Sequence, residues 1–104
     1  MTPYVGTWAE EGLPGDVTSV VYTISLEGNL FCVQGIDKSD GTALRISAIT
    51  WDDETLRFES LFPRTRHKAS HEFTVVEEGR ARHTTRYADE DGNHVVEELW
   101  KRVS

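Results

Sequence analysis

The sequence predicts an all-β domain: about eight antiparallel strands in an up-and-down meander that closes into a barrel. Apolar and polar residues nearly alternate along most of the chain, which is typical of strands with one buried and one solvated face. Short turn signals rich in Gly, Asp, Asn or Pro recur between these runs. No segment shows a convincing helical period, and no repeat has solenoid length. Closure is favoured because a closed barrel leaves no sheet edge exposed.

The N-terminal part of the chain is expected to supply three strands, over residues 4–9, 17–26 and 30–36. A loop rich in Gly, Pro and acidic residues, residues 10–16, separates the first two. The second strand has its apolar side chains in phase on one face, and a Glu-Gly-Asn turn returns the chain into the third. The DKSDG turn at 37–41 then ends this part.

The clearest hairpin lies at the centre of the chain, where apolar runs at 44–51 and 56–62 flank an acidic turn at 52–54. Within the first run the apolar residues change from even to odd positions between Ala48 and Ile49. A β-bulge at this point would let both halves of the strand face the same core.

A third hairpin is expected to join residues 66–76 to residues 80–88. A left-handed Gly79 in its turn pairs odd residues with odd ones, so the histidines at 71 and 83 share the inner face. The other face carries Glu, Arg, Ser and Thr and is expected to be a solvated surface with cross-strand ion pairs.

The closing strand is expected over residues 94–103, after the turn DEDGN at 89–93. Glu97 and Glu98 point to opposite faces of this strand, so one of them is expected to approach the interior. The sequence alone leaves open which one.

Length and composition restrict the class of protein. The 104 residues suffice for one domain with one core. A net charge of −7 argues against nucleic-acid binding, because phosphate contacts need clustered Lys and Arg. The single cysteine suits a reducing compartment, and the sequence has no signal-peptide pattern and no run long enough to span a bilayer. We therefore expect a cytoplasmic protein with neither a nucleic acid nor a membrane as its partner.

Two sites at opposite ends of the chain carry a resemblance to a known family. Gly6-Thr7-Trp8 lies in the first expected strand, and Arg102 lies in the last. This arrangement resembles the calycin superfamily, especially its small lipocalin-like domains, in which G-x-W opens the barrel and a final-strand Arg packs over the Trp. The resemblance implies a lipocalin-like barrel in which Arg102 forms a cation–π contact with Trp8.

The inner faces of the expected strands mix aromatic rings with hydroxyls and imidazoles. A core used only for folding would be richer in Val, Ile and Leu, because buried polar groups need partners. The pattern predicts a cavity for a small apolar or amphipathic molecule. Its expected lining is Tyr22, Phe58, Phe62, His71, Phe73, His83 and Tyr87. The alternative is a filled core whose polar groups satisfy one another.

Neither a metal ion nor another cofactor is expected. His67 and His71 lie four residues apart on one strand, about 13 Å, which is too far to bind one ion together. His71 and His83 are diagonal neighbours about 7–8 Å apart, but no third ligand is specified.

Two other classes of function remain beside ligand binding. The second is a protein-interaction module, either a homodimer or an inhibitor-like barrel. The third is a small barrel cyclase or isomerase that uses His71, His83 or Tyr87 as acid or base. The sequence contains no nucleophile–base motif that favours catalysis.

Overall fold

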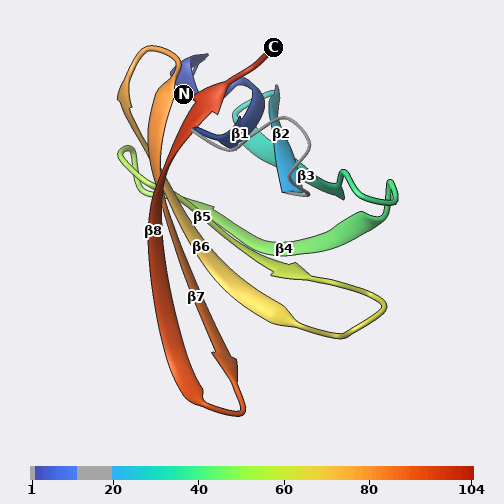
Figure 1. The fold of residues 1–104 in the computed structure, drawn as a ribbon. Coiled ribbons are helices and arrows are strands. Elements are labelled where there is room, and N and C mark those ends of the chain that lie inside the picture. The colour runs from blue at the N-terminus through green and yellow to red at the C-terminus, as the bar shows by residue number, and fades with distance from the viewer. Residues whose placement is uncertain (1, 12–19) are drawn as a thin grey trace.

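The computed structural model describes residues 2–11 and 20–104, which form a closed barrel of eight antiparallel strands in up-and-down order (Figure 1). The predicted fold class is therefore confirmed. The strands are β1 Gly6–Glu10, β2 Val20–Glu27, β3 Leu30–Asp37, β4 Ala43–Trp51, β5 Leu56–Leu61, β6 Lys68–Glu77, β7 Arg80–Asp89 and β8 Gly92–Arg102. A 3-10 turn, Thr2–Tyr4, precedes β1. No helix among the described residues is long and apolar enough to cross a membrane.

Some strand ends differ from those expected. The predicted start of the second strand, at residue 17, lies outside the described residues. The strand β6 begins at Lys68 rather than at residue 66, because Arg66 has a φ of 59° and belongs to the preceding turn. The last hairpin is longer than expected, since Asp89 still pairs with Gly92.

The predicted bulge lies in β4. Ser47 pairs with Glu59 of β5, and the next pair is Thr50 with Arg57. Ala48 and Ile49 together therefore lie opposite one residue, Phe58. Ala48 has a φ of 53°, a left-handed conformation that accommodates the extra residue.

The predicted register of the third hairpin is also confirmed. Phe73 pairs with His83, and His71 pairs with Thr85, so the two histidines are diagonal neighbours on the inner face. On the outer face Glu72 forms an ion pair with Arg86.

One end of the barrel, which we name the closed end, is sealed by the N-terminal 3-10 turn. Tyr4 is buried there, with its ring 4.9 Å from the ring of Trp51 and 5.9 Å from that of Phe31. Its hydroxyl donates to the carbonyl of Glu54 at 2.6 Å and accepts the amide N–H of Val75 at 3.1 Å. These contacts tie the turn to strands far away in the sequence.

Trp8 and Arg102 meet at the same end. Figure 1 shows the N- and C-terminal ends of the chain close together there. Trp8 is fully buried, and its indole N–H donates to the carbonyl of Tyr4 at 3.0 Å. The guanidinium carbon of Arg102 lies 5.8 Å from the centroid of the Trp8 ring, within cation–π range. A Cβ at Gly6 would come within 2.5 Å of the Arg102 side chain, so only glycine leaves room for it.

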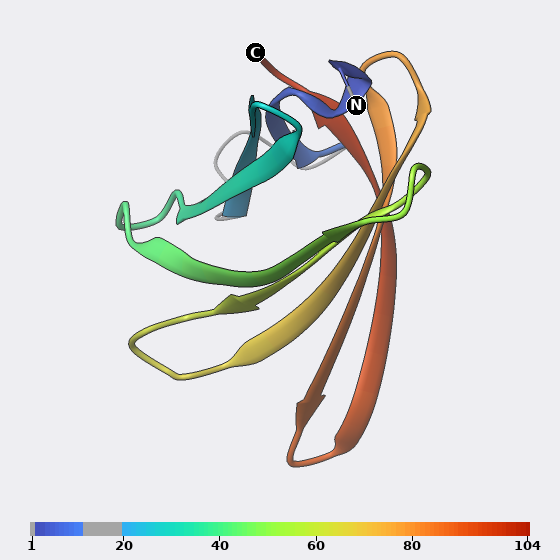
Figure 2. The same cartoon turned by 180° about the vertical axis from the view of Figure 1, so that it is seen from behind.

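The opposite end, which we name the open end, flares because the strands differ in length. The strand β8 pairs with β7 over ten residues, from Lys101 to Gly92. It pairs with β1 only from Arg102 to Trp100. Figures 1 and 2 show the β7–β8 hairpin reaching well beyond β1, β2 and β3. The inner faces of the long strands therefore remain accessible at this end.

Candidate functional site

A cavity of about 590 Å³ lies inside the open end and opens to solvent. Its walls are mainly apolar and come from six of the strands and the residues that follow them. The lining residues are Glu10, Val20, Tyr22, Ser60, Phe62, His67, Lys68, Ala69, His71, His83, Thr85, Tyr87, Ala88, Asp89, Glu98 and Trp100. Its size is in the range of about 300–1,000 Å³ that is usual for small-molecule sites.

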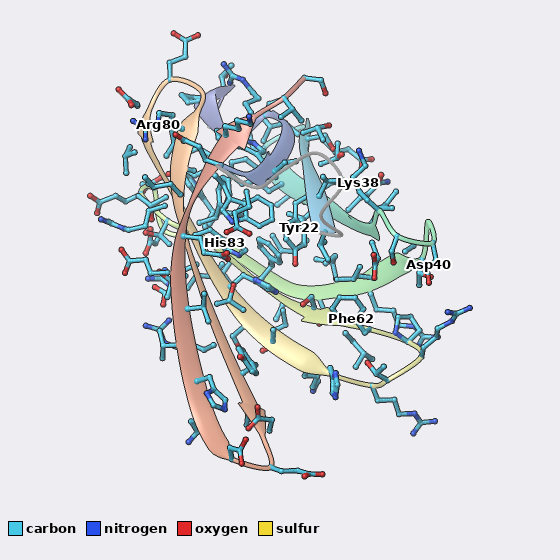
Figure 3. All side chains as sticks on the ribbon, in the orientation of Figure 1. Tyr22, Lys38, Asp40, Phe62, Arg80 and His83 are labelled. Carbon is cyan, nitrogen blue, oxygen red and sulfur yellow. The ribbon has the colours of Figure 1, made fainter. Side chains whose placement is uncertain are left out.

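Five of the seven residues that the sequence predicted to line a cavity do line this one. They differ in burial: Tyr22, His71 and His83 are buried, Phe62 is half-buried, and Tyr87 is exposed at the mouth. Figure 3 shows Tyr22 and His83 close together in the middle of the barrel, and Phe62 near the end of β5.

The other two predicted residues, Phe58 and Phe73, lie in the packed core beside the cavity. Phe58 stacks on His71 with ring centroids 4.7 Å apart. Phe73 is fully buried between Trp8, at 5.0 Å, and His83, at 5.8 Å. They support the imidazoles and do not line the cavity.

The buried polar groups form one continuous hydrogen-bonded chain. Ser60 Oγ lies 2.7 Å from His71 Nε2, and His71 Nδ1 lies 2.8 Å from His83 Nε2. The Tyr22 hydroxyl lies 3.4 Å from His71 Nε2, and Thr85 Oγ1 lies 3.4 Å from His83 Nε2. Residues of four strands, β2, β5, β6 and β7, thus meet at two imidazole rings.

Both histidines are neutral at physiological pH. Burial lowers the pKa of His71 to about 4. Burial, together with the neighbouring His71, lowers the pKa of His83 to about 3. A neutral imidazole has one N–H and one bare nitrogen, so the chain has two proton arrangements. Either His83 donates to His71 and His71 donates to Ser60, or both bonds are reversed.

In both arrangements one atom remains without a partner. His83 Nδ1 is buried and has no hydrogen-bonding partner among the described residues. Leaving such a group unpaired costs about 1–3 kcal/mol.

Tyr22 is placed by a glycine. Gly35 lies opposite it on β3, and a Cβ there would come within 2.9 Å of the Tyr22 ring. Burial raises the pKa of the Tyr22 hydroxyl, which therefore keeps its proton. Tyr22 is a neutral donor and acceptor at the inner end of the cavity.

The question that the sequence left open on the last strand is answered by burial. Glu98 lines the cavity, whereas Glu97 faces outward and lies 3.9 Å from Arg82. Partial burial, a hydrogen bond with Glu10 and the charge of Glu10 raise the pKa of Glu98 to about 7, against a smaller lowering by a hydrogen bond from the Trp100 side chain. This wall of the cavity is therefore a carboxyl pair that holds a proton more tightly than usual.

Sequence reasoning did not assign Glu10, Glu98 or Trp100 to the site. Trp100 shares its face of β8 with Glu98, and its backbone is opposite that of Glu10. The alternating pattern of the last strand places Trp100 inward, but pairing across the closure of the barrel was needed to bring Glu10 beside it. Ser60 and Thr85 were expected on the inner faces but not selected as site residues.

The donor set does not suit a metal ion. Within residues 2–11 and 20–104 there is no group of three or more His, Cys, Asp or Glu side chains placed to hold one. The chemistry available is that of an apolar cavity with neutral hydrogen-bonding groups at its inner end and carboxyls on one wall. No model of a known protein family, no curated protein and no solved structure matches this chain.

Proposed function

We propose that the protein binds a small, mostly apolar molecule in the cavity at the open end, as a lipocalin-like barrel. The observation that carries the proposal is the cavity itself, which has mainly apolar walls and the hydrogen-bonded side chains of Tyr22, His71 and His83 at its inner end. An eight-stranded barrel filled by its own side chains would lack such a cavity. The contact of Arg102 with Trp8 supports the resemblance to the calycin superfamily.

A cavity-filling variant tests this proposal. Ala69 lines the cavity, and its neighbour Ser70 is exposed on the outer face of β6, so Ala69→Trp and Ser70→Trp form a matched pair. We expect a neutral apolar fluorescent dye to bind the wild-type protein and Ser70→Trp alike and to bind Ala69→Trp much more weakly. Native mass spectrometry of freshly purified protein should show a non-covalent adduct on the wild-type protein and on Ser70→Trp, and much less of it on Ala69→Trp.

Two results would contradict the proposal. One is a dye that binds all three proteins equally, which would place it outside the barrel. The other is the absence of binding to the wild-type protein across a series of apolar dyes.

A second candidate function, a homodimer, is favoured by the outer face of β8. The alternate residues Val95, Glu97, Leu99, Lys101 and Val103 lie on this face, and its three apolar side chains are 46–63% exposed. The order is self-complementary: an antiparallel copy centred on Leu99 places Glu97 against Lys101 and Val95 against Val103.

Sedimentation velocity distinguishes the two functions. If this face pairs two copies, Lys101→Glu dissociates the dimer, and adding Glu97→Lys to that variant restores it. A wild-type monomer at high protein concentration would exclude this candidate and leave ligand binding unaffected.

A further inference from the structure

The carboxyl wall of the cavity points to the chemical class of the ligand. We propose that the apolar ligand carries a protonated amine, which binds between the Glu10–Glu98 carboxyl pair and the aromatic rings of Tyr22 and Trp100. This inference rests on the proposed function, because it concerns the same cavity.

The first support is the position of the two carboxyls. Glu98 lies on β8 two residues before Trp100, and Glu10 lies opposite Trp100 at the end of β1. Both line the cavity, and their carboxyls are near enough to interact directly. Two like charges at a partly buried site repel each other, so the pair retains a proton or attracts a cation.

The second support is the set of aromatic rings beside the pair. The Tyr22 and Trp100 ring centroids lie 5.6 Å apart with an angle of 36° between the planes, and both rings line the cavity. Trp100 is only 5% exposed. Ring faces attract an ammonium group, and the attraction is strongest where water is excluded.

The third support is the charge of the remaining lining. His83 on β7 is the backbone pairing partner of Glu98 and is neutral, and His71 on β6 is also neutral. Asp89 is engaged by His94 at 2.7 Å. Two further lining residues, His67 just before β6 and Lys68 at its start, have side chains that are exposed at the mouth of the cavity. No described cationic side chain forms an ion pair with Glu10 or Glu98.

Proton balance gives this binding mode a signature. Below about pH 7 the Glu98 carboxyl carries a proton in the free protein. An ammonium group stabilises the ionised pair, so binding releases this proton to the buffer. Amine affinity therefore rises as the pH rises towards and past the pKa of Glu98, whereas the affinity of an alcohol does not.

The experiment uses three probes with the same apolar chain: n-octylamine, n-octanol and n-octanoate. Isothermal titration calorimetry at about pH 8 is expected to give a roughly tenfold higher affinity for the amine than for the alcohol, with the carboxylate weakest. At about pH 6 the preference for the amine should fall, and titrations in buffers of different ionisation enthalpy should show proton release.

Two variants locate the effect. Glu98→Gln should bring the ratio of amine to alcohol affinity close to one. Glu97→Gln, one residue away on the outer face, should leave the ratio unchanged. The inference is overturned if the alcohol or the carboxylate binds as tightly as the amine, or if Glu98→Gln keeps the preference. Absence of binding by all three probes would instead contradict the proposed function, and the inference with it.

Discussion

The two ends of this barrel use similar aromatic residues for different purposes. At the closed end, the rings of Tyr4, Phe31 and Trp51 pack edge to face, and Trp8 packs in the same way on Phe73. Polar atoms such as the Tyr4 hydroxyl and the Trp8 N–H have backbone partners there. At the open end, rings lie beside a cavity, and one buried nitrogen, His83 Nδ1, has no partner among the described residues.

The difference concerns stability, and under the proposed function it also separates stability from binding. Dense packing at the closed end stabilises the barrel, because Tyr4, Trp8 and Phe31 are buried there and their apolar surface is removed from water. The buried imidazoles and partly buried carboxyls of the open end cost free energy of folding. That cost is expected where a site is kept ready for a ligand.

The largest effect expected from a single change belongs to the closed end. Trp8→Ala removes a fully buried indole and should lower the free energy of unfolding by about 3–5 kcal/mol. Phe62→Ala, at the half-buried wall of the cavity, should cost less than about 1.5 kcal/mol, because little packing is lost there. Urea denaturation of both variants measures the contrast. Equal losses would show that the two ends do not differ in their contribution to stability.

The next largest effect is a loss of stability in acid, which arises from the two buried histidines of the open end. Between about pH 6.5 and about pH 4 the unfolded chain protonates both histidines while the folded chain does not. The free energy of unfolding should therefore fall as the pH falls, by at most about 1.4 kcal/mol per pH unit for each histidine. Urea midpoints measured across this range should fall less steeply in His83→Gln than in the wild type. The exposed His67 provides the control, and His67→Gln should retain the full slope.

The smallest effect tests the seal at the closed end. Arg102→Met keeps an apolar stem beside Trp8 but removes the charge above its ring. The expected loss is about 0.5–2 kcal/mol, which includes the weak bonds of the guanidinium to the Pro3 carbonyl and Glu78. Lys101→Met, on the exposed outer face of β8, is the matched substitution and should leave the thermal midpoint nearly unchanged. If both variants melt together, the cation–π contact contributes nothing measurable.

The local pattern of the sequence determined the strands and their faces. Alternation with a period of two assigns each side chain to the inner or the outer face, and Gly79 sets the register that brings His71 and His83 together. The phase change at Ala48 was enough to predict the bulge, because an extra residue there lets Ile46 and Trp51 both pack against the core. These features depend on neighbours in the chain, so they can be predicted without the fold.

The depth of each residue along the barrel was decided only by the tertiary structure. Phe58 and Phe73 share the inner faces of Ser60 and His71, yet they lie in the packed core, because strand stagger sets how far each position is from the open end. Closure of β1 on β8 brought Glu10 beside Trp100 and Glu98, and the 3-10 turn carried Tyr4 to the closed end. Such contacts join residues 50 to 90 positions apart. Periodicity fixes the face of a side chain, whereas its partners across the barrel depend on strand lengths and non-local pairing that no local pattern contains.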